Sequence, residues 1–370
     1  MRTQPQDVIA KLEADNSRLA KEKILLDAMN EGLDEFFEGL KMCLDKLYTF
    51  GVKQVPTKDE VVAGQGCPWN VFKDLAEKLY NRELTGHNAR DAINLVMSSA
   101  TAEQWNGFYR RILIKDLRCG VSEKTVNSVA KKNKFGKYMV PVFTCQLAHD
   151  SANHEKKLVG KKMLEVKLDG VRTLAIVHPD GKVDMLSRNG KEFTNFGHIQ
   201  DEISAVVKQD PPPYPLVLDG EVMSENFQDL MKQVHRKGSA DAKDAVLHLF
   251  DFIPLEEFKK GKWDKTQTMR TAMLKAWYQK HETNLNAVRV LDHEIVNLDT
   301  PEGQTTYTEV NKRAVEGGYE GIMIKDLNAP YECKRSHAWL KLKPFKLKAI
   351  VLIPIEVSQT QVTGKTARKK

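Results

Sequence analysis

The chain has 370 residues, of which 41% are apolar and 29% charged, and its formal net charge at pH 7 is +7. These values are typical of a globular protein with two or three domains, and the positive charge is compatible with a polyanionic partner without requiring one. No run of about 18 apolar residues is present, which excludes a transmembrane helix. The N-terminal residues lack the apolar core of a signal peptide, so we expect a cytoplasmic protein, or a nuclear one in a eukaryote.

Helical periodicity covers the first part of the chain. It predicts one amphipathic helix over 6–30 and further helices over 33–49, 69–80, 88–99 and 105–117, with another beginning near Ser122. Trp105, Phe108 and Tyr109 share one helix face, and such faces belong more often to a core than to a surface that stacks bases. No strand pattern precedes residue 140. We therefore expect an all-α domain over residues 1–138.

A basic turn near the end of this domain has two possible roles. Gly120 leads into the helix that begins near Ser122, and the free N–H groups of a helix N-terminus can bind a phosphate. Lys115, Arg118 and Lys124 add positive charge beside that turn. The same pattern fits a helix hairpin with a solvated basic rim equally well, so both interpretations remain open.

From residue 141 onward the periodicity becomes strand-like, with helices between the strands. The predicted strands are 162–167, 172–178, 183–187, 215–219, 246–252, 288–291, 321–325 and 339–343, and the predicted helices lie near 197–208, 225–235, 266–280 and 304–316. Such a mixture without strict alternation predicts an α+β domain with substantial antiparallel sheet, over residues 139–346. A remnant strand near 349–357 and a basic tail are expected within 347–370.

The turn after the strand at 162–167 carries the first of several chemically suggestive motifs. Lys167 precedes Asp169-Gly170 and Arg172, and alone it is more often an ordinary strand-end lysine. The others are Ser187-Arg188-Asn189-Gly190, Asp219-Gly220-Glu221, Phe250-Asp251-Phe252, Glu320-Gly321 and Lys341-Leu342-Lys343. Taken together, the lysines and arginines suit a triphosphate, the carboxylates of Glu221 and Glu320 suit Mg²⁺, and an aromatic ring such as Phe250 can stack on a purine.

In this order the six motifs resemble the nucleotidyltransferase motifs of ATP-dependent DNA ligases of the bacteriophage-like kind. The helical residues, above all 114–120, resemble that family's N-terminal DNA-binding domain, which favours a DNA ligase over RNA ligases and capping enzymes. The resemblance implies an all-α DNA-binding domain followed by an α+β, ATP-grasp-like adenylation domain with antiparallel sheets. It also implies the replication, repair and recombination context of such enzymes.

The resemblance further implies a role for each motif. Lys167 would be the nucleophile that becomes adenylated. The residues implied to contact ATP are Glu165, Lys167, Arg172, Arg188, Glu221, Phe250, Arg335, Lys341 and Lys343. Glu221 and Glu320 would bind Mg²⁺, with a ribose contact as the alternative for Glu221. Lys325 is either a further site lysine or a strand end.

The implied activity is the sealing of 5′-phosphate/3′-hydroxyl nicks in duplex DNA by a monomer without a membrane partner. Lys115, Arg118 and Lys124 would contact DNA phosphates. The family normally continues past the lysine pair into an oligonucleotide-binding barrel, and too few residues follow Lys343 for five strands, so we expect most of that domain to be absent. A truncated non-sealing fragment that binds DNA or ATP, and an RNA-end ligase, remain the alternatives.

Overall fold

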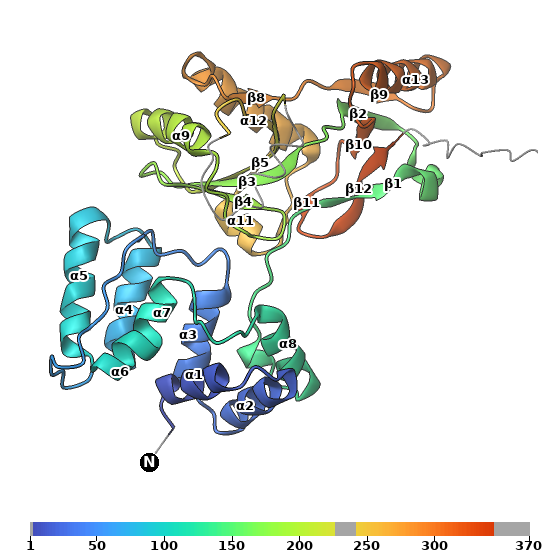
Figure 1. The fold of residues 1–370 in the computed structure, drawn as a ribbon. Helices are drawn as coiled ribbons and strands as arrows, with labels where there is room; N and C mark the ends of the chain where they lie inside the picture. The colour runs from blue at the N-terminus through green and yellow to red at the C-terminus, as the bar shows by residue number, and fades with distance from the viewer. Residues whose placement is uncertain (1–2, 226–241, 344–370) are drawn as a thin grey trace, which may run out of the picture.

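The computed structural model describes residues 3–225 and 242–343 (Figure 1). A helical part occupies the chain up to Tyr138, and strands begin at Leu147. The predicted all-α part followed by an α+β part is therefore confirmed. The expected remnant strand and basic tail lie outside the described residues, as does nearly all of the helix predicted near 225–235. No described helix is both long and apolar enough to cross a membrane.

The helical part packs around one aromatic-rich core that includes Phe36, Phe72, Trp105 and Phe108, all fully buried. The prediction that the aromatics after residue 104 belong to a core is confirmed. The helices are α1 Pro5–Ala14, α2 Arg18–Asn30, α3 Asp34–Leu44, α4 Trp69–Tyr80, α5 Gly86–Ser99, α6 Ala102–Gln104, a π-helical turn Trp105–Tyr109, α7 Arg110–Leu113, α8 Glu123–Lys132 and a 3₁₀ turn Gly136–Tyr138.

The single helix predicted over 6–30 is wrong, because the chain breaks into α1 and α2 between residues 14 and 18. Ser17 caps α2 by accepting a hydrogen bond from the backbone N–H of Ala20. A serine in this position satisfies one of the free N–H groups of a new helix. The helical periodicity of the apolar residues therefore continues across a break that only the run Asp15-Asn16-Ser17 signals.

The second part contains two five-stranded sheets, and most of their neighbouring strands are antiparallel. One sheet has the order β1-β12-β10-β2-β9 and the other β4-β3-β5-β6-β8, while β7 pairs with β11. The strands are β1 Leu147–Asp150, β2 Lys161–Val166, β3 Val171–Val177, β4 Val183–Ser187, β5 Leu216–Met223, β6 Val246–Pro254, β7 Lys262–Trp263, β8 Val288–Val290, β9 Glu294–Asn297, β10 Ile322–Asp326, β11 Tyr331–Glu332 and β12 Arg335–Leu342. Each predicted strand is present, although several ends shift by one to four residues.

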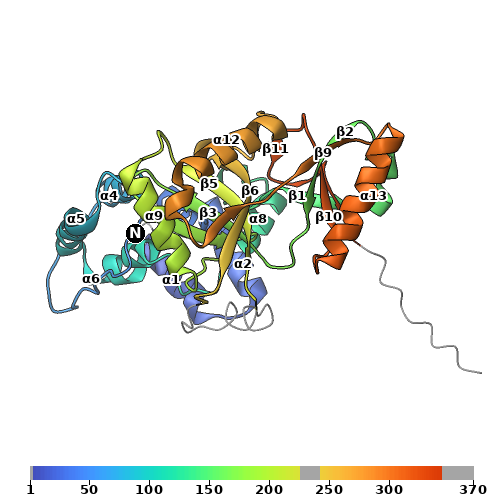
Figure 2. The same ribbon diagram turned by 90° about the horizontal axis from the view of Figure 1, so that it is seen from above.

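Helices cover the outer faces of the two sheets (Figure 2). α9 (Gly197–Gln209) and α12 (Gln267–His281) share a core with the sheet of β3, β5 and β6, and α13 (Pro301–Glu316) packs on the sheet of β2 and β10. A short helix, α11 (Leu255–Lys259), follows β6. A third cluster, which includes Leu174, Val217 and Trp339, joins residues of both sheets. The sheets therefore meet across an apolar contact, and a cavity opens beside it.

The helical part touches the second part through polar contacts. Arg82, at the end of α4, donates two hydrogen bonds to one carboxylate oxygen of Asp180, at 2.9 and 2.6 Å. Lys182 donates to the hydroxyl of Thr49 at 3.0 Å. The loop between β3 and β4 carries both Asp180 and Lys182, so one turn of the second sheet makes these contacts with the helices.

Candidate active site

The cavity lies where the ends of β2, β10 and β12 meet the other sheet. All the residues predicted to contact ATP line it except Lys343. Its walls are formed by Leu147, Ala148, Glu165, Val166, Lys167, Leu168, Arg172, Arg188, Glu221, Phe250, Leu291, Met323, Lys325, Arg335, Trp339 and Lys341. The lining is rich in cations and contains two aromatic rings, which is a donor set suited to an adenosine triphosphate.

Strand pairing places Lys167 beside Glu320. β2 and β10 are antiparallel with Val166 opposite Ile322, so the residue after β2 lies next to the residues before β10. Two backbone hydrogen bonds continue the ladder, from the N–H of Lys167 to the carbonyl of Gly321 and from the N–H of Glu320 to the carbonyl of Lys167. The Lys167 ammonium forms an ion pair with the Glu320 carboxylate. Two motifs 153 residues apart therefore form one chemical unit.

The strand β12 brings the lysine pair to the same place. Leu342 lies opposite Ile322, so Lys343 comes next to the turn that carries Glu320, and its ammonium contacts the second oxygen of Glu320 at 2.8 Å. Lys341 lines the cavity. Burial alone would raise the pKa of Glu320, but the hydrogen bonds from Lys167 and Lys343 outweigh it and hold the pKa below its usual value. Glu320 is therefore an anion that orients both lysines.

Of the two predicted Mg²⁺ ligands, Glu221 has a carboxylate in the cavity wall, whereas the carboxylate of Glu320 is paired with two lysines. Glu221 lines the cavity, and burial raises the pKa of its carboxyl group. A desolvated carboxylate at the wall of such a cavity fits a Mg²⁺ ion that is also held by phosphate oxygens. Each oxygen of Glu320 is already paired with a lysine ammonium, so in this structure Glu320 is a counter-ion. Its role as a metal ligand stays a prediction.

Gly170 fixes the turn that follows Lys167. Its backbone N–H donates to a carboxylate oxygen of Glu221 at 3.1 Å. A Cβ atom at position 170 would overlap the carbonyl oxygen of Val222 and approach the sulfur of Met223. The glycine of the Asp-Gly pair is thus required by the close approach of this turn to β5, and not by the turn conformation itself.

Replacing Gly170 with alanine should therefore disturb both the fold and the cavity. We expect Gly170→Ala to lower the free energy of unfolding by about 1–3 kcal/mol, as other overpacked substitutions do, and to slow any reaction of Lys167. Gly197→Ala is the matched control, because no atom lies within 4 Å of the added Cβ. Urea unfolding of both variants measures the difference, and equal stabilities would contradict this role of Gly170.

Arg172 is held by a buried carboxylate. Its guanidinium donates to both oxygens of Asp219 at 2.6 and 2.7 Å, and Asp219 is fully buried. Tyr331 donates its hydroxyl to the same carboxylate at 2.7 Å. The guanidinium also lies over the rings of Phe250 and Trp339, at 4.9 and 5.4 Å from their centres. Arg172 therefore lines the cavity as a rigid cation whose charge is already balanced.

A second buried ion pair forms another part of the cavity wall. Glu165 accepts from the Lys325 ammonium at 2.6 Å, and both side chains are almost completely buried. The ammonium lies over the rings of Phe250 and Trp339, at 5.0 and 4.6 Å from their centres. Because Lys325 neutralises Glu165, the carboxylate can remain in the cavity wall next to the aromatic rings.

The sequence left Lys325 open between a site lysine and a strand end, and Trp339 was not predicted as a site residue. Both could have been found from the period of two in a strand, because alternate side chains share a face. Lys325 lies two residues after Met323, which lines the cavity, while Ile322 and Ile324 point into the core under α13. Trp339 likewise lies two residues before Lys341.

The two predicted arginines at the rim are placed differently. Arg188 is exposed at the end of β4, and Arg335 is exposed at the start of β12. The Arg335 guanidinium donates to the carbonyl of Ala148 on the neighbouring strand. Both line the cavity, so each can meet a phosphate that enters from solvent.

The structure corrects one of the three predicted DNA contacts. Lys115 turns inward, and its ammonium donates to the carbonyls of Met42, Asp45 and Tyr48. Because three backbone carbonyls hold its ammonium, Lys115 fixes the end of α3 and the loop after it. In this conformation it cannot contact a DNA phosphate. Arg118 and Lys124 are exposed around the turn that leads into α8, as the phosphate-binding interpretation requires.

Comparison with known proteins agrees with this geometry. The family model described as the ATP dependent DNA ligase domain matches residues 145–343. A probable DNA ligase of Rhodococcus opacus is 29% identical over 228 residues, which are 59% of this chain and 41% of that protein. The DNA ligase of Enterobacteria phage T4 is 22% identical over 332 residues, covering 77% of this chain and 65% of the phage protein.

A solved structure named Pmar-Lig_PreS3 is 60% identical, covers 92% of this chain and 78% of its own, and has a TM-score of 0.58. The chain spans about two fifths of the length of the bacterial relatives that it matches. The family match covers more than half of the 370 residues and includes each of the six motifs. The chain therefore belongs to the family of ATP-dependent DNA ligase domains.

Proposed function

We propose that this chain seals nicks in duplex DNA through an adenylated Lys167, with ATP as the source of AMP. The observation that carries the proposal is the Lys167–Glu320–Lys343 unit at the mouth of a cation-rich cavity with two aromatic rings. Residues 1–138 would bind the DNA and residues 139–346 would carry out adenylation. The family supports the use of ATP and the action on DNA.

In the first step the Lys167 amine attacks the α-phosphorus of ATP. The Lys167 ammonium first loses a proton to solvent, because only the neutral amine is nucleophilic. The nitrogen–phosphorus bond then forms as the bond to the bridging oxygen breaks, pyrophosphate leaves, and the nitrogen gives its second proton to solvent. Glu320 holds the lysine in place but is a weak base, since its pKa lies below the usual value. Lys341 lines the same cavity as Lys167 and would balance the phosphate charge. Positioning and charge neutralisation dominate such displacements at phosphorus.

Glu221 is the residue that would hold Mg²⁺, and Glu320 is the second predicted ligand. When bound, the ion neutralises charge on the phosphates. Phe250 and Trp339 would pack against the base, with the Glu165–Lys325 pair beside the two rings. Arg172, fixed by Asp219, would keep the aromatic rings in place.

The remaining steps use the same cavity. AMP passes from Lys167 to the 5′-phosphate of the nick, which breaks the nitrogen–phosphorus bond and restores the amine. The 3′-hydroxyl of the nick then attacks this activated phosphate, forms the phosphodiester and releases AMP. Each step is again an in-line displacement at phosphorus. We expect the exposed rim arginines Arg188 and Arg335 to contact the incoming 5′-phosphate.

The direct test incubates the full chain with ATP, Mg²⁺ and a duplex that carries one labelled nick. We expect a ligated strand whose formation depends on ATP and on the 5′-phosphate. If labelled AMP appears on the protein but no strand is sealed, the alternative of a non-sealing fragment holds. If a nick in RNA is sealed faster than the same nick in DNA, the alternative of an RNA-end ligase holds.

The exposed basic turn predicts a specific dependence of DNA affinity on salt. Lys124→Ala should reduce the slope of log affinity against log salt by about one, because one phosphate contact is lost. Lys115→Ala should leave that slope unchanged and instead lower the free energy of unfolding by about 1–3 kcal/mol, because three buried carbonyls lose their donor. Fluorescence anisotropy with labelled duplex at several salt concentrations, together with urea unfolding, separates the two effects. If the slope were unchanged in Lys124→Ala, this turn would not be part of the surface that contacts DNA.

A further inference from the structure

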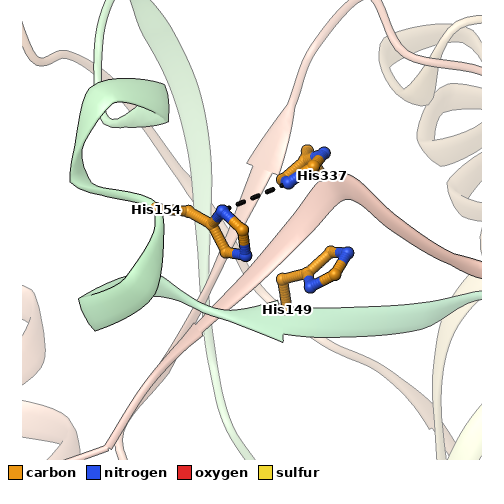
Figure 3. Close-up of side chains that lie close together, drawn as sticks. All are labelled: His149, His154 and His337. Atoms are coloured by element: carbon orange, nitrogen blue, oxygen red, sulfur yellow. Dashed lines mark hydrogen bonds between the residues drawn. The ribbon is translucent and has the colours of Figure 1, made fainter.

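Three histidines that are far apart in the sequence meet on the outside of the sheet that contains β1 and β12 (Figure 3). His149 lies in β1, His154 lies between two short 3₁₀ turns that follow this strand, and His337 lies in β12. None of them lines the cavity around Lys167. The family's adenylation chemistry therefore does not account for their convergence.

The separations of the ring nitrogens approach those of a metal site. Nε2 of His337 lies 3.2 Å from Nδ1 of His154, and each of the three residues offers a nitrogen within 4.8 Å of the others. Two imidazole nitrogens bound tetrahedrally to one Zn²⁺ ion, at about 2.0–2.1 Å each, lie about 3.3 Å apart. One pair already has this separation, and small rotations of the third ring would close the site.

The local backbone presents these rings together. Ala148 pairs with Ser336 and His149 pairs with Leu340, so β12 has a bulge of three residues, 337–339, opposite the middle of β1. The hydroxyl of Ser336 accepts from the N–H of Ala338 at 3.1 Å, which stabilises the bulge. Bulges redirect side chains out of the regular alternation. Here Trp339 of the bulge lines the cavity, whereas the exposed His337 does not.

The rings are also accessible and close-packed. His337 is exposed, and His149 and His154 are half-buried, so an ion can reach all three from solvent. The His149 and His337 rings are nearly parallel, with centres 4.4 Å apart, and the His154 ring meets both of them edge-on. Among the residues that the structure describes, this is the one group of three metal-binding side chains with such short separations.

We propose that His149, His154 and His337 bind a divalent transition-metal ion of the zinc class, with solvent in the remaining coordination position. Imidazole nitrogen is a favoured ligand of Zn²⁺, Cu²⁺ and Ni²⁺ but a poor one for Mg²⁺, so this site is chemically distinct from the Mg²⁺ position at Glu221. The bound ion joins β1 and the turn after it to β12, whose Arg335, Trp339 and Lys341 line the cavity. Metal binding thereby stiffens one wall of that cavity.

The test is a titration of the metal-stripped full chain with Zn²⁺ in competition with a chromogenic chelator. We expect one ion per chain, and removal of one ligand in His337→Ala should weaken binding by more than the roughly 10–100-fold that loss of an outer-shell partner costs. His154→Ala, which changes a turn and no strand, repeats the test if His337→Ala does not fold. His87→Ala is the matched control, because it removes an exposed histidine from α5 and should leave the affinity unchanged.

Two further measurements make the assignment specific. With Co²⁺ in place of Zn²⁺, the visible absorption of a nitrogen-bound ion should appear in the unmodified chain and in His87→Ala but not in His337→Ala. Zn²⁺ should also slow amide hydrogen exchange within residues 335–342 of the unmodified chain. Equal affinities in the unmodified chain, His337→Ala and His154→Ala, or no binding by the unmodified chain, would overturn the proposal. Because neither ATP nor DNA is present, the result does not depend on the proposed ligase activity.

Discussion

Lys167→Ala should abolish transfer of AMP from ATP to the protein. The residue is the proposed nucleophile, and no other described lysine combines a place in the cavity with an ion pair to Glu320. Removing the nucleophile of an enzyme typically costs on the order of 10⁶ in rate, so labelling should fall to background. The measurement is incorporation of label from α-labelled ATP in the presence of Mg²⁺, followed by acid precipitation.

Lys161→Ala is the matched control for this experiment. Lys161 begins the same strand, β2, but is exposed and does not line the cavity. The Lys161→Ala variant should incorporate label from ATP at the rate of the unmodified chain. Label that survives in Lys167→Ala would assign the nucleophile to another residue and would contradict the proposed mechanism. Matching circular dichroism spectra of the two variants would show that the loss is chemical and not a failure to fold.

Asp219→Ala should produce the largest loss of stability at the site. The substitution leaves the Arg172 guanidinium buried without its carboxylate and also removes the acceptor of the Tyr331 hydroxyl. Breaking a buried ion pair by removing one partner costs about 3–5 kcal/mol, because the remaining charge is not compensated. Chemical denaturation should show this decrease in the free energy of unfolding, and labelling of Lys167 should fall with it.

The control is Asp264→Ala, which removes one partner of the exposed pair with Lys262. Such surface pairs contribute about 0–1 kcal/mol, so this variant should unfold almost as the unmodified chain does. If Asp219→Ala were equally stable, the buried network would not organise the cavity. If it were unstable but labelled at the normal rate, Arg172 would have no part in positioning the rings around the nucleotide.

Much of the second part was predictable because its longer strands are apolar runs, as in β3, or alternate between buried and less buried side chains, as in β6. The strand at 183–187 is present with the predicted ends, and the strand predicted over 172–178 forms at 171–177. β1 and β9 were missed, since both are four residues long and neither alternates cleanly between buried and exposed side chains. Short strands at sheet edges leave little hydrophobic pattern to detect.

The order of the motifs predicted most of the residues that line the cavity, but it did not predict the contacts that each residue makes. Glu320 was predicted as a metal ligand, and the strand pairing that places it between Lys167 and Lys343 is invisible in a linear sequence. Lys115 was predicted to contact DNA because it neighbours a glycine turn. Its direction depends on the loop after α3, whose carbonyls it binds, and this loop lies about 70 residues away.

The histidine cluster was also not predictable from the sequence, because it depends on long-range strand pairing. His149 and His154 are close in the sequence, but the third ligand comes from position 337 and is presented by a bulge. The spacing of His149 and His154 is compatible with the histidine half of a zinc-finger motif, but the sequence has no cysteine pair to complete it. Only the parallel pairing of β1 with β12 brings the three rings together.

Lys167 is the residue that we propose accepts AMP. The most direct measurement is peptide mapping by mass spectrometry of the unmodified full chain after incubation with ATP and Mg²⁺. We predict one added AMP per chain, on the peptide that contains Lys167, and its loss on incubation with nicked duplex DNA. Modification of a different residue, or no modification under conditions in which the chain binds ATP, would contradict the claim.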